Sequence, residues 1–148
     1  MEITLGFGSN LGKRKETIEQ AYILLEEELG EMISKSSFLE TEPWGFESEN
    51  KFMNSVAVFR TSKKPEQALD ICNAIEAKLG RKRSETSVGY SSRTIDIDIL
   101  FCENKIIDTE RLKVPHPLID KRDFVLKPLK EIMPDFIHPL LGKKISEI

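Results

Sequence analysis

The stretch Thr94–Cys102, TIDIDILFC, gives the clearest indication of the fold. Isoleucine alternates with aspartate at its start, and a period of two is the side-chain period of a β-strand. One face of this strand would carry three isoleucines toward a core, and the other face would carry Asp96 and Asp98. We therefore expect a strand here, although aspartate is a poor strand former and its double use requires a reason.

The segments outside this stretch alternate between strand and helix patterns. The expected strands are centred on Ile3–Phe7, 32–42, 52–61 and 105–107, the second and third pairing as a wide hairpin. The expected helices run from about 18 to Gly30 and from Pro65 to Gly80, with helical turns near 119–121 and 124–132 and with Pro128, Pro134 and Pro139 as breakers. The order strand, helix, strand, strand, helix, strand predicts an α+β fold, a ferredoxin-like sandwich with a mainly antiparallel sheet and helices packed on it.

Length and composition narrow the class of protein. A chain of 148 residues predicts one domain over residues 1–148. The net charge of -3 and the pI near 5.5 argue against non-specific binding to nucleic acid or to an anionic membrane. No apolar run approaches the ~20 residues of a membrane helix, and the start of the chain lacks a signal-peptide pattern. Cys72 and Cys102 lie in apolar stretches, which favours reduced thiols and a cytoplasmic protein.

The two aspartates carry the sharpest chemical signal. Their Cα atoms would lie about 6.6 Å apart, close enough for the carboxylates to bridge a pair of divalent cations. The alternative is a solvated strand face whose acids discourage edge-to-edge pairing. Arg81, Arg83 and Arg93 flank the pair in sequence, and arginine together with oxygen ligands for Mg²⁺ suits a polyphosphate. The residues alone thus predict metal-assisted chemistry on a polyphosphate, because phosphoryl transfer needs little more.

The glycines near the first strand do not match a nucleotide-binding loop. Gly6, Gly8 and Gly12 are spaced one residue too far for the dinucleotide fingerprint, and no phosphate-binding GxxxxGK[ST] run occurs. A tight connection, with Asn10 as a turn former or cap, is favoured over phosphate binding.

Histidine and the aromatic residues give weaker signals. His116 lies between two prolines that would fix the direction of its ring, but a lone histidine is more often structural, as we expect for His138. Asn54, two residues after Phe52 and on the same strand face, could offer amide hydrogen bonds to a flat ring in a pocket lined by Trp44. Three large aromatic residues are core residues by default: Trp44, Phe52 and Phe124. Trp44, however, sits in a polar loop and could line a pocket.

Six segments together resemble the 6-hydroxymethyl-7,8-dihydropterin pyrophosphokinases, enzymes of folate biosynthesis, along nearly the whole chain. They are GSNLG from Gly8, NSVA from Asn54, IEAKLGRKR from Ile75, RTIDIDIL from Arg93, RLKVPHP from Arg111, and Arg122 with FVLKPL shortly after it. The resemblance implies transfer of pyrophosphate from ATP to the hydroxymethyl group of the reduced pterin, with attack of the substrate hydroxyl on the β-phosphorus and release of AMP.

The same resemblance implies roles for individual residues. Asp96 and Asp98 would hold two Mg²⁺ ions, and Arg81 and Arg93 would neutralise charge on the transferring group. Other ATP contacts would come from Asn73, Glu76, Arg83, Ile99, Arg111, His116 and Arg122. The pterin would be bound by Thr41, Pro43, Trp44, Phe52, Asn54 and Phe124, the two phenylalanines forming a sandwich. Loops 43–51 and 81–92 would act as lids, and we expect a monomer without a nucleic-acid or membrane partner.

Three positions depart from the family pattern. Tyr90 lies in a loop where many relatives carry a tryptophan followed by Gly-Pro. Pro117 stands at an often aromatic position, and Phe52 stands where tyrosine is common. Neither of these last two changes removes a charge that the chemistry requires.

Two other functions remain open on the residues alone. A nucleotidyltransferase could use the paired aspartates and would release pyrophosphate rather than AMP. A ferredoxin-like RNA-binding module with Phe52 on its sheet would show salt-dependent RNA affinity that is indifferent to Mg²⁺.

Overall fold

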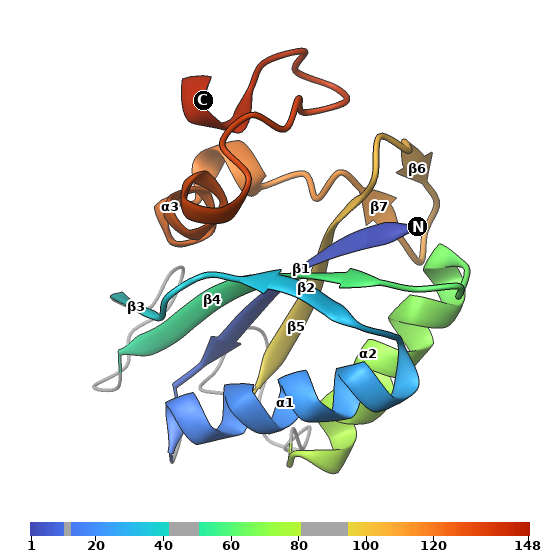
Figure 1. Ribbon diagram of the computed structural model, residues 1–148, viewed down its shortest axis with the longest axis vertical. Helices are drawn as coiled ribbons and strands as arrows, with labels where there is room; N and C mark the ends of the chain where they lie inside the picture. Colours follow the sequence, from blue (N-terminus) through green and yellow to red (C-terminus); the bar gives the residue numbers. More distant parts are fainter. Residues whose placement is uncertain (11–12, 42–50, 81–94) are drawn as a thin grey trace.

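The computed structural model describes residues 1–10, 13–41, 51–80 and 95–148, and a five-stranded sheet forms its centre (Figure 1). The strands of this sheet are β1 (Glu2–Ser9), β2 (Met32–Lys35), β3 (Leu39–Thr41), β4 (Phe52–Arg60) and β5 (Asp96–Cys102). The helices are α1 (Arg14–Glu28), α2 (Pro65–Lys78) and α3 (Asp123–Ile132), with the short helical turns η1 (Ile119–Lys121) and η2 (Ile145–Glu147). A small second sheet pairs β6 (Ile107–Asp108) with β7 (Lys113–Val114).

The strand order confirms the predicted ferredoxin-like α+β fold. The order across the sheet is β2-β4-β1-β5, with β3 also paired to β4, and all these pairs are antiparallel. Helix α1 connects β1 to β2, which are separated by β4, and α2 connects β4 to β5. This split arrangement of strand, helix and strand is the repeating unit of the ferredoxin-like sandwich.

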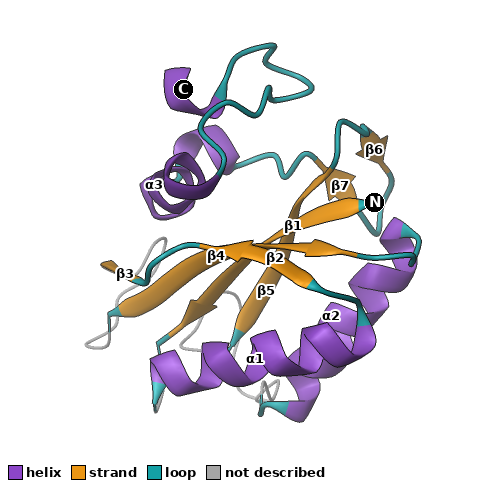
Figure 2. Cartoon of the chain, in the orientation of Figure 1, coloured by secondary structure: helices purple, strands orange, loops and turns teal. Residues whose placement is uncertain are grey.

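Apolar cores fill both sides of the sheet. Helices α1 and α2 lie on one face and α3 lies on the other (Figures 1 and 2). Ile3, Leu5 and Phe7 of β1 belong to the first core, together with the apolar faces of α1 and α2. Val56 and Leu100 belong to the second core, against α3 and the two short helical turns. Every residue of β1 after Glu2 is therefore buried.

Strand β5 changes its pattern of faces partway along. Its isoleucines pack in the first core, whereas the consecutive residues Leu100 and Phe101 both pack in the second. The pairing of β1 with β5 moves directly from Thr4 opposite Phe101 to Leu5 opposite Ile99, so Leu100 is the extra residue of a β-bulge. The bulge lets the strand fill the core under α3 and still hold its two aspartates on that same face.

The prediction of one continuous strand over 32–42 was wrong, because the chain breaks into β2 and β3. The N–H of Ser36 donates to the Val56 carbonyl at 2.8 Å, and its hydroxyl oxygen accepts the Val56 N–H at 2.9 Å. The backbone and hydroxyl of Ser37 then bond to the Glu131 carboxylate of α3. The chain advances three residues from Ser36 to Leu39, whereas the paired segment of β4, from Val56 to Asn54, advances only two. The extra residue makes the chain bulge outward toward α3.

Pro128 does not break a helix, which corrects a second expectation. It lies inside α3 and is buried. Proline has no N–H for the carbonyl four residues earlier, and an interior position costs about 3 kcal/mol. The burial of Val125, Leu126 and Leu129 on the same helix offsets this cost. The strand expected at 105–107 is also displaced, to Ile107–Asp108.

The ends of the first helix and the state of the thiols agree with expectation. Gly30 ends α1 with φ +150, and a Cβ there would stand 2.0 Å from the Arg60 carbonyl oxygen, so only glycine fits.

Cys72 and Cys102 are free and buried, and burial raises their pKa to about 12 and about 11 respectively. Among the described helices, none has the length and apolarity to cross a bilayer.

Candidate active site

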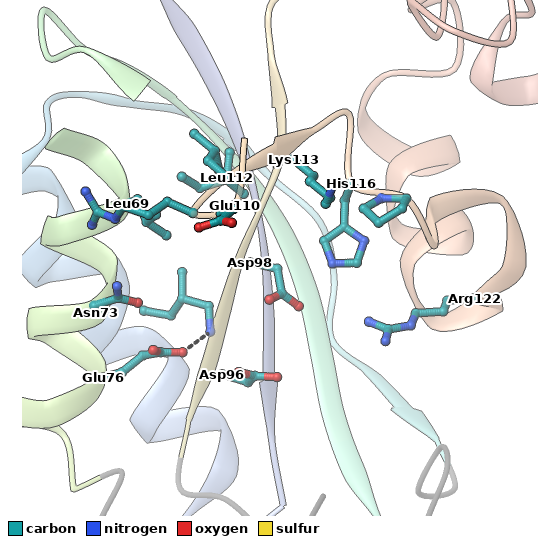
Figure 3. A pocket seen from close by; sticks show the side chains of 14 residues that line it. Leu69, Asn73, Glu76, Asp96, Asp98, Glu110, Leu112, Lys113, His116 and Arg122 are labelled. Carbon is teal, nitrogen blue, oxygen red and sulfur yellow. Dashed lines mark hydrogen bonds between the residues drawn. The ribbon is translucent and has the colours of Figure 1, made fainter. Parts of the chain in front are cut away.

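A pocket of about 410 Å³ surrounds the edge of strand β5 (Figure 3). This strand lies at the end of the sheet order, so one of its backbone edges faces away from β1. Helix α2 borders the pocket on one side, and the segment from 110 to 122 borders it on the other. The sequence-predicted residues that line it are Asn73, Glu76, Asp96, Asp98, Ile99, Arg111, His116 and Arg122.

Asp96 and Asp98 project from the same side of β5, as the alternation predicted. Both are half-buried, and Figure 3 shows them on the side that faces His116 and Arg122. In the sheet Asp96 is directly opposite Gly8, and Asp98 is directly opposite Gly6. At Gly8 no side chain fills the space beside the Asp96 carboxylate, which lets a ligand approach the sheet closely. At Gly6 the Leu100 side chain covers the backbone, because a Cβ there would stand 3.3 Å from it.

Sequence reasoning missed that these two glycines are the sheet partners of the aspartates. Gly6 and Gly8 have the same period of two as Asp96 and Asp98, which was the available signal. The register that places each glycine beside an aspartate depends on the pairing of β1 with β5, a strand that lies far later in the chain.

Glu76 contacts the strand between the two aspartates. Its side chain is 5% exposed, and its carboxylate accepts the Ile97 N–H at 2.8 Å (Figure 3). Peptide groups alternate in direction along a strand, so the N–H and C=O of Ile99 point toward the same edge as the Ile97 N–H. A side chain that the resemblance assigned to ATP thus also holds the backbone of the aspartate strand.

His116 is fixed by two backbone contacts. Its N–H donates to the Leu100 carbonyl at 3.0 Å, and its Nδ1 accepts the Leu118 N–H at 3.2 Å. With Nδ1 as an acceptor, the neutral ring carries its proton on Nε2. Burial lowers the pKa of His116, the nearby Arg122 guanidinium lowers it further, and Asp96 acts in the opposite direction. The ring is therefore a neutral hydrogen-bond donor at pH 7.

Two arginines stand at the rim of the pocket. The Arg111 guanidinium forms an ion pair with Asp70 of α2, which raises the pKa of Arg111. Arg122 directly precedes α3, and its guanidinium lies 5.5 Å from the centroid of the Phe124 ring. These two side chains bring positive charge to the same pocket as the two aspartates.

A second cluster lies on β3 and β4. Asn54 is 4% exposed, and its amide nitrogen donates to the Leu39 carbonyl at 3.2 Å and to the Thr41 hydroxyl at 2.7 Å. The position of a Cβ on Gly8 would be 3.4 Å from the Asn54 side-chain oxygen and 3.6 Å from the Phe52 ring. The side-chain oxygen of Asn54 and one edge of the Phe52 ring therefore both lie next to Gly8.

Gly8 connects this cluster with the aspartates. It is paired with Asn54 on one side and with Asp96 on the other, so the three residues form one row across the sheet. Two strand spacings separate Asn54 from Asp96 by about 10 Å. Phe124 lies half-buried on α3, on this same face of the sheet. The predicted pterin residues and the predicted metal ligands are thus neighbours.

Several predicted residues lie outside the described part of the chain. They are Pro43, Trp44, Arg81, Arg83, Tyr90 and Arg93, with most of the two expected lid loops. Within the described residues no group of three or more acidic, histidine or cysteine side chains could hold a metal ion. The oxygen donors of Asp96 and Asp98 fit Mg²⁺, which is typically held by one or two carboxylates together with substrate phosphates.

Comparison with known proteins defines the class. Residues 4–134 match the family model of 7,8-dihydro-6-hydroxymethylpterin-pyrophosphokinase (HPPK). The chain is 41% identical over 138 residues to the 2-amino-4-hydroxy-6-hydroxymethyldihydropteridine pyrophosphokinase of Porphyromonas gingivalis, covering 93% of each chain. It is 41% identical over 145 residues to that of Aquifex aeolicus, covering 98% of this chain and 88% of the relative. These similarities identify a pyrophosphokinase.

The chain belongs to the 7,8-dihydro-6-hydroxymethylpterin-pyrophosphokinase family. A solved structure of an HPPK-DHPS in complex with substrates is similar in fold, with a TM-score of 0.79 at 19% identity. The similarity covers 99% of this chain and 42% of that one, so this chain spans less than half the length of the solved relative.

Proposed function

We propose that this enzyme transfers pyrophosphate from ATP to the hydroxymethyl group of 6-hydroxymethyl-7,8-dihydropterin, forming the pterin pyrophosphate and AMP for folate biosynthesis. The observation that carries the proposal is the row of Asn54, Gly8 and Asp96. In this row the buried Asn54 amide can recognise a flat polar ring, and the Asp96 carboxylate suits a metal–polyphosphate complex. The two groups lie about two strand spacings apart.

The triphosphate of ATP would occupy the pocket beside β5. Asp96 and Asp98 would hold two Mg²⁺ ions, which supply charge neutralisation along the phosphates. The Nε2–H of His116 and the guanidinium groups of Arg122 and Arg111 would donate hydrogen bonds to phosphate oxygens. Arg81, Arg83 and Arg93 complete the proposed set of cations.

The nucleoside part of ATP would lie between α2 and the edge of β5. There the N–H and C=O of Ile99 point outward, and a purine offers a matching donor and acceptor along one edge. Asn73 of α2 lines the same pocket, as does the carboxylate of Glu76. This side of the pocket also contains the apolar side chain of Leu69, which suits an aromatic base.

The pterin would lie over Gly8. Phe52 and Phe124 would hold its two ring faces, while Asn54, Thr41, Pro43 and Trp44 would bind its polar edge. The hydroxymethyl group would then point toward Asp96. Its oxygen forms the new bond to the β-phosphorus as the bond from that phosphorus to the α,β-bridging oxygen breaks, and AMP leaves with that oxygen.

The test is an assay of products. Incubation with ATP, Mg²⁺ and the reduced pterin alcohol should give AMP and pterin pyrophosphate in equal amounts. The Asp96→Asn variant should lose this activity, whereas Asp108→Asn, at an exposed site on β6, should retain it. Formation of ADP, or release of free pyrophosphate, would contradict the proposal. RNA affinity that depends on salt and survives Asp96→Asn would instead support an RNA-binding module.

We also propose that the enzyme is a monomer in the cytoplasm.

A further inference from the structure

Arg14 contacts two places that are distant from it in sequence. It is the first residue of α1, and its side chain is 26% exposed. One nitrogen of its guanidinium, Nη1, donates to the Lys51 carbonyl at 2.7 Å. The other, Nη2, pairs with the Glu40 carboxylate at 2.7 Å. The fork of one guanidinium therefore joins the start of α1 to β3 and to the residue that precedes β4.

The position of this arginine is unfavourable for the helix itself. Lys13, Arg14 and Lys15 stand at the start of α1, where the helix dipole disfavours positive charge. The N-cap residue Lys13 makes no side-chain capping hydrogen bond. The helix therefore does not explain an arginine here, whereas the two long-range contacts do.

The two contacts act on the end of the β3–β4 pair. Glu40 is opposite Met53, Thr41 is opposite Phe52, and Lys51 is the residue directly before Phe52. Strand β3 has three residues, too few to fix the position of this end by its own hydrogen bonds. On the left of Figure 1, the first turn of α1 lies below the end at which the chain enters β4. A cross-link to the long α1 supplies the missing rigidity.

We propose that Arg14 is a positioning residue for the pterin, an inference that rests on the proposed function of the Phe52 and Asn54 cluster. Arg14 holds the Glu40 side chain and the Lys51 backbone on either side of the Thr41–Phe52 pair, so that the Phe52 ring keeps its place over Gly8 and the Thr41 hydroxyl keeps its contact with Asn54. The ATP pocket lies on the far side of β1, at the edge of β5. Loss of Arg14 should therefore weaken pterin binding and spare nucleotide binding.

The experiment compares Arg14→Ala, Arg14→Lys and Arg60→Ala with the wild type by AMP formation. Arg60 is the matched control, because it pairs with Glu31 at the opposite end of β4, at 3.8 Å. Arg14→Ala should raise KM for the reduced pterin by about tenfold, the order expected for a lost charge-assisted contact. KM for ATP and kcat should stay within about twofold of wild type. Arg14→Lys should be intermediate, because an ammonium lacks the planar fork that spans both partners.

A second variant keeps the inference testable if Arg14→Ala fails to fold. Glu40→Gln removes the charge of one partner and leaves the Lys51 carbonyl in place, and it should raise KM for the pterin by a smaller factor. An unchanged KM for the pterin in Arg14→Ala, an equal rise in both KM values, or the same effect in Arg60→Ala would overturn the assignment. A wild type that forms no AMP would instead defeat the proposed function itself.

Discussion

The two sides of strand β5 carry different chemistry on one backbone. Ile97 and Ile99 are 5% and 4% exposed and pack against the core under α1 and α2. Asp96 and Asp98 alternate with them, are half-buried, and line the pocket on the face that carries α3. The comparison teaches that over residues 96–99, before the strand reaches the core under α3, stability and chemistry are divided between the two faces. Substitutions on adjacent residues should therefore affect one property and leave the other intact.

The largest effect is expected at Asp98. In Asp98→Ala a carboxylate suited to metal is lost from the pocket, and kcat should fall by about 10²–10³-fold or more, as for other losses of electrostatic stabilisation. The half-exposed site leaves no large cavity, so thermal unfolding should change little. Turnover at the wild-type rate would end the assignment of this face to the chemistry.

The neighbouring Ile97 should show the opposite behaviour. Ile97→Ala leaves a cavity in the core under α1 and α2 and should lower the free energy of unfolding by about 2–5 kcal/mol. Denaturant titration measures this loss. At a temperature where the variant is still folded, its KM for ATP should match that of the wild type. A variant as stable as the wild type would contradict the division between the faces.

Glu76 lines the pocket and also accepts the N–H of the core residue Ile97, so its variants test how the pocket and the stability of the strand are connected. Glu76→Leu leaves the buried Ile97 N–H without this acceptor and should cost about 1–3 kcal/mol of stability. Glu76→Gln keeps an acceptor of the same length and should recover most of that loss. Equal stability of the two variants, from urea unfolding, would show that the contact contributes little.

Substitution of Gly8, over which the pterin is proposed to lie, should have a smaller effect. An added methyl group would meet Asn54 and Phe52 at ordinary contact distances of 3.4 and 3.6 Å, so Gly8→Ala should fold with nearly wild-type stability. The methyl would occupy the space proposed for the pterin, and KM for the pterin should rise by about tenfold. An unchanged KM for the pterin would move that substrate elsewhere on the sheet.

The smallest effect concerns pH. Burial lowers the pKa of His116 and of His138, and Asp120 opposes the shift at His138. Each neutral ring therefore contributes stability that is present above the ordinary histidine value of about 6.5 and is lost as the pH falls through the lowered pKa.

His138 can be tested apart from the site. Its Nδ1 accepts the N–H groups of Leu140 and Leu141, both at 3.1 Å. His138→Asn keeps an acceptor that does not titrate, so the fall in unfolding free energy between pH 7 and pH 5 should be shallower than in the wild type. The same slope in both proteins would assign the acid sensitivity to other groups.

Local patterns predicted most of the elements and failed at specific residues. The period of two located β1 and β5, the expected strand at 52–61 matches β4, and the spacing of apolar residues located α1 and α2. The break at Ser36 was not predictable, because it depends on a hydroxyl bonded to β4 and on Glu131 of α3. Pro128 misled for the same reason, since burial against a distant core outweighs its local preference.

The sequence by itself determined the alternation of isoleucine and aspartate, the ferredoxin-like order of elements, and the resemblance to a family that the comparisons then established. Only the tertiary structure decided that Asn54, Gly8 and Asp96 share a row, that Glu76 holds the Ile97 N–H, and that Arg14 reaches Lys51. The physical reason is that side-chain periodicity is a local property of the backbone. Register between distant strands is set jointly by packing on both faces of the sheet, and no single segment encodes it.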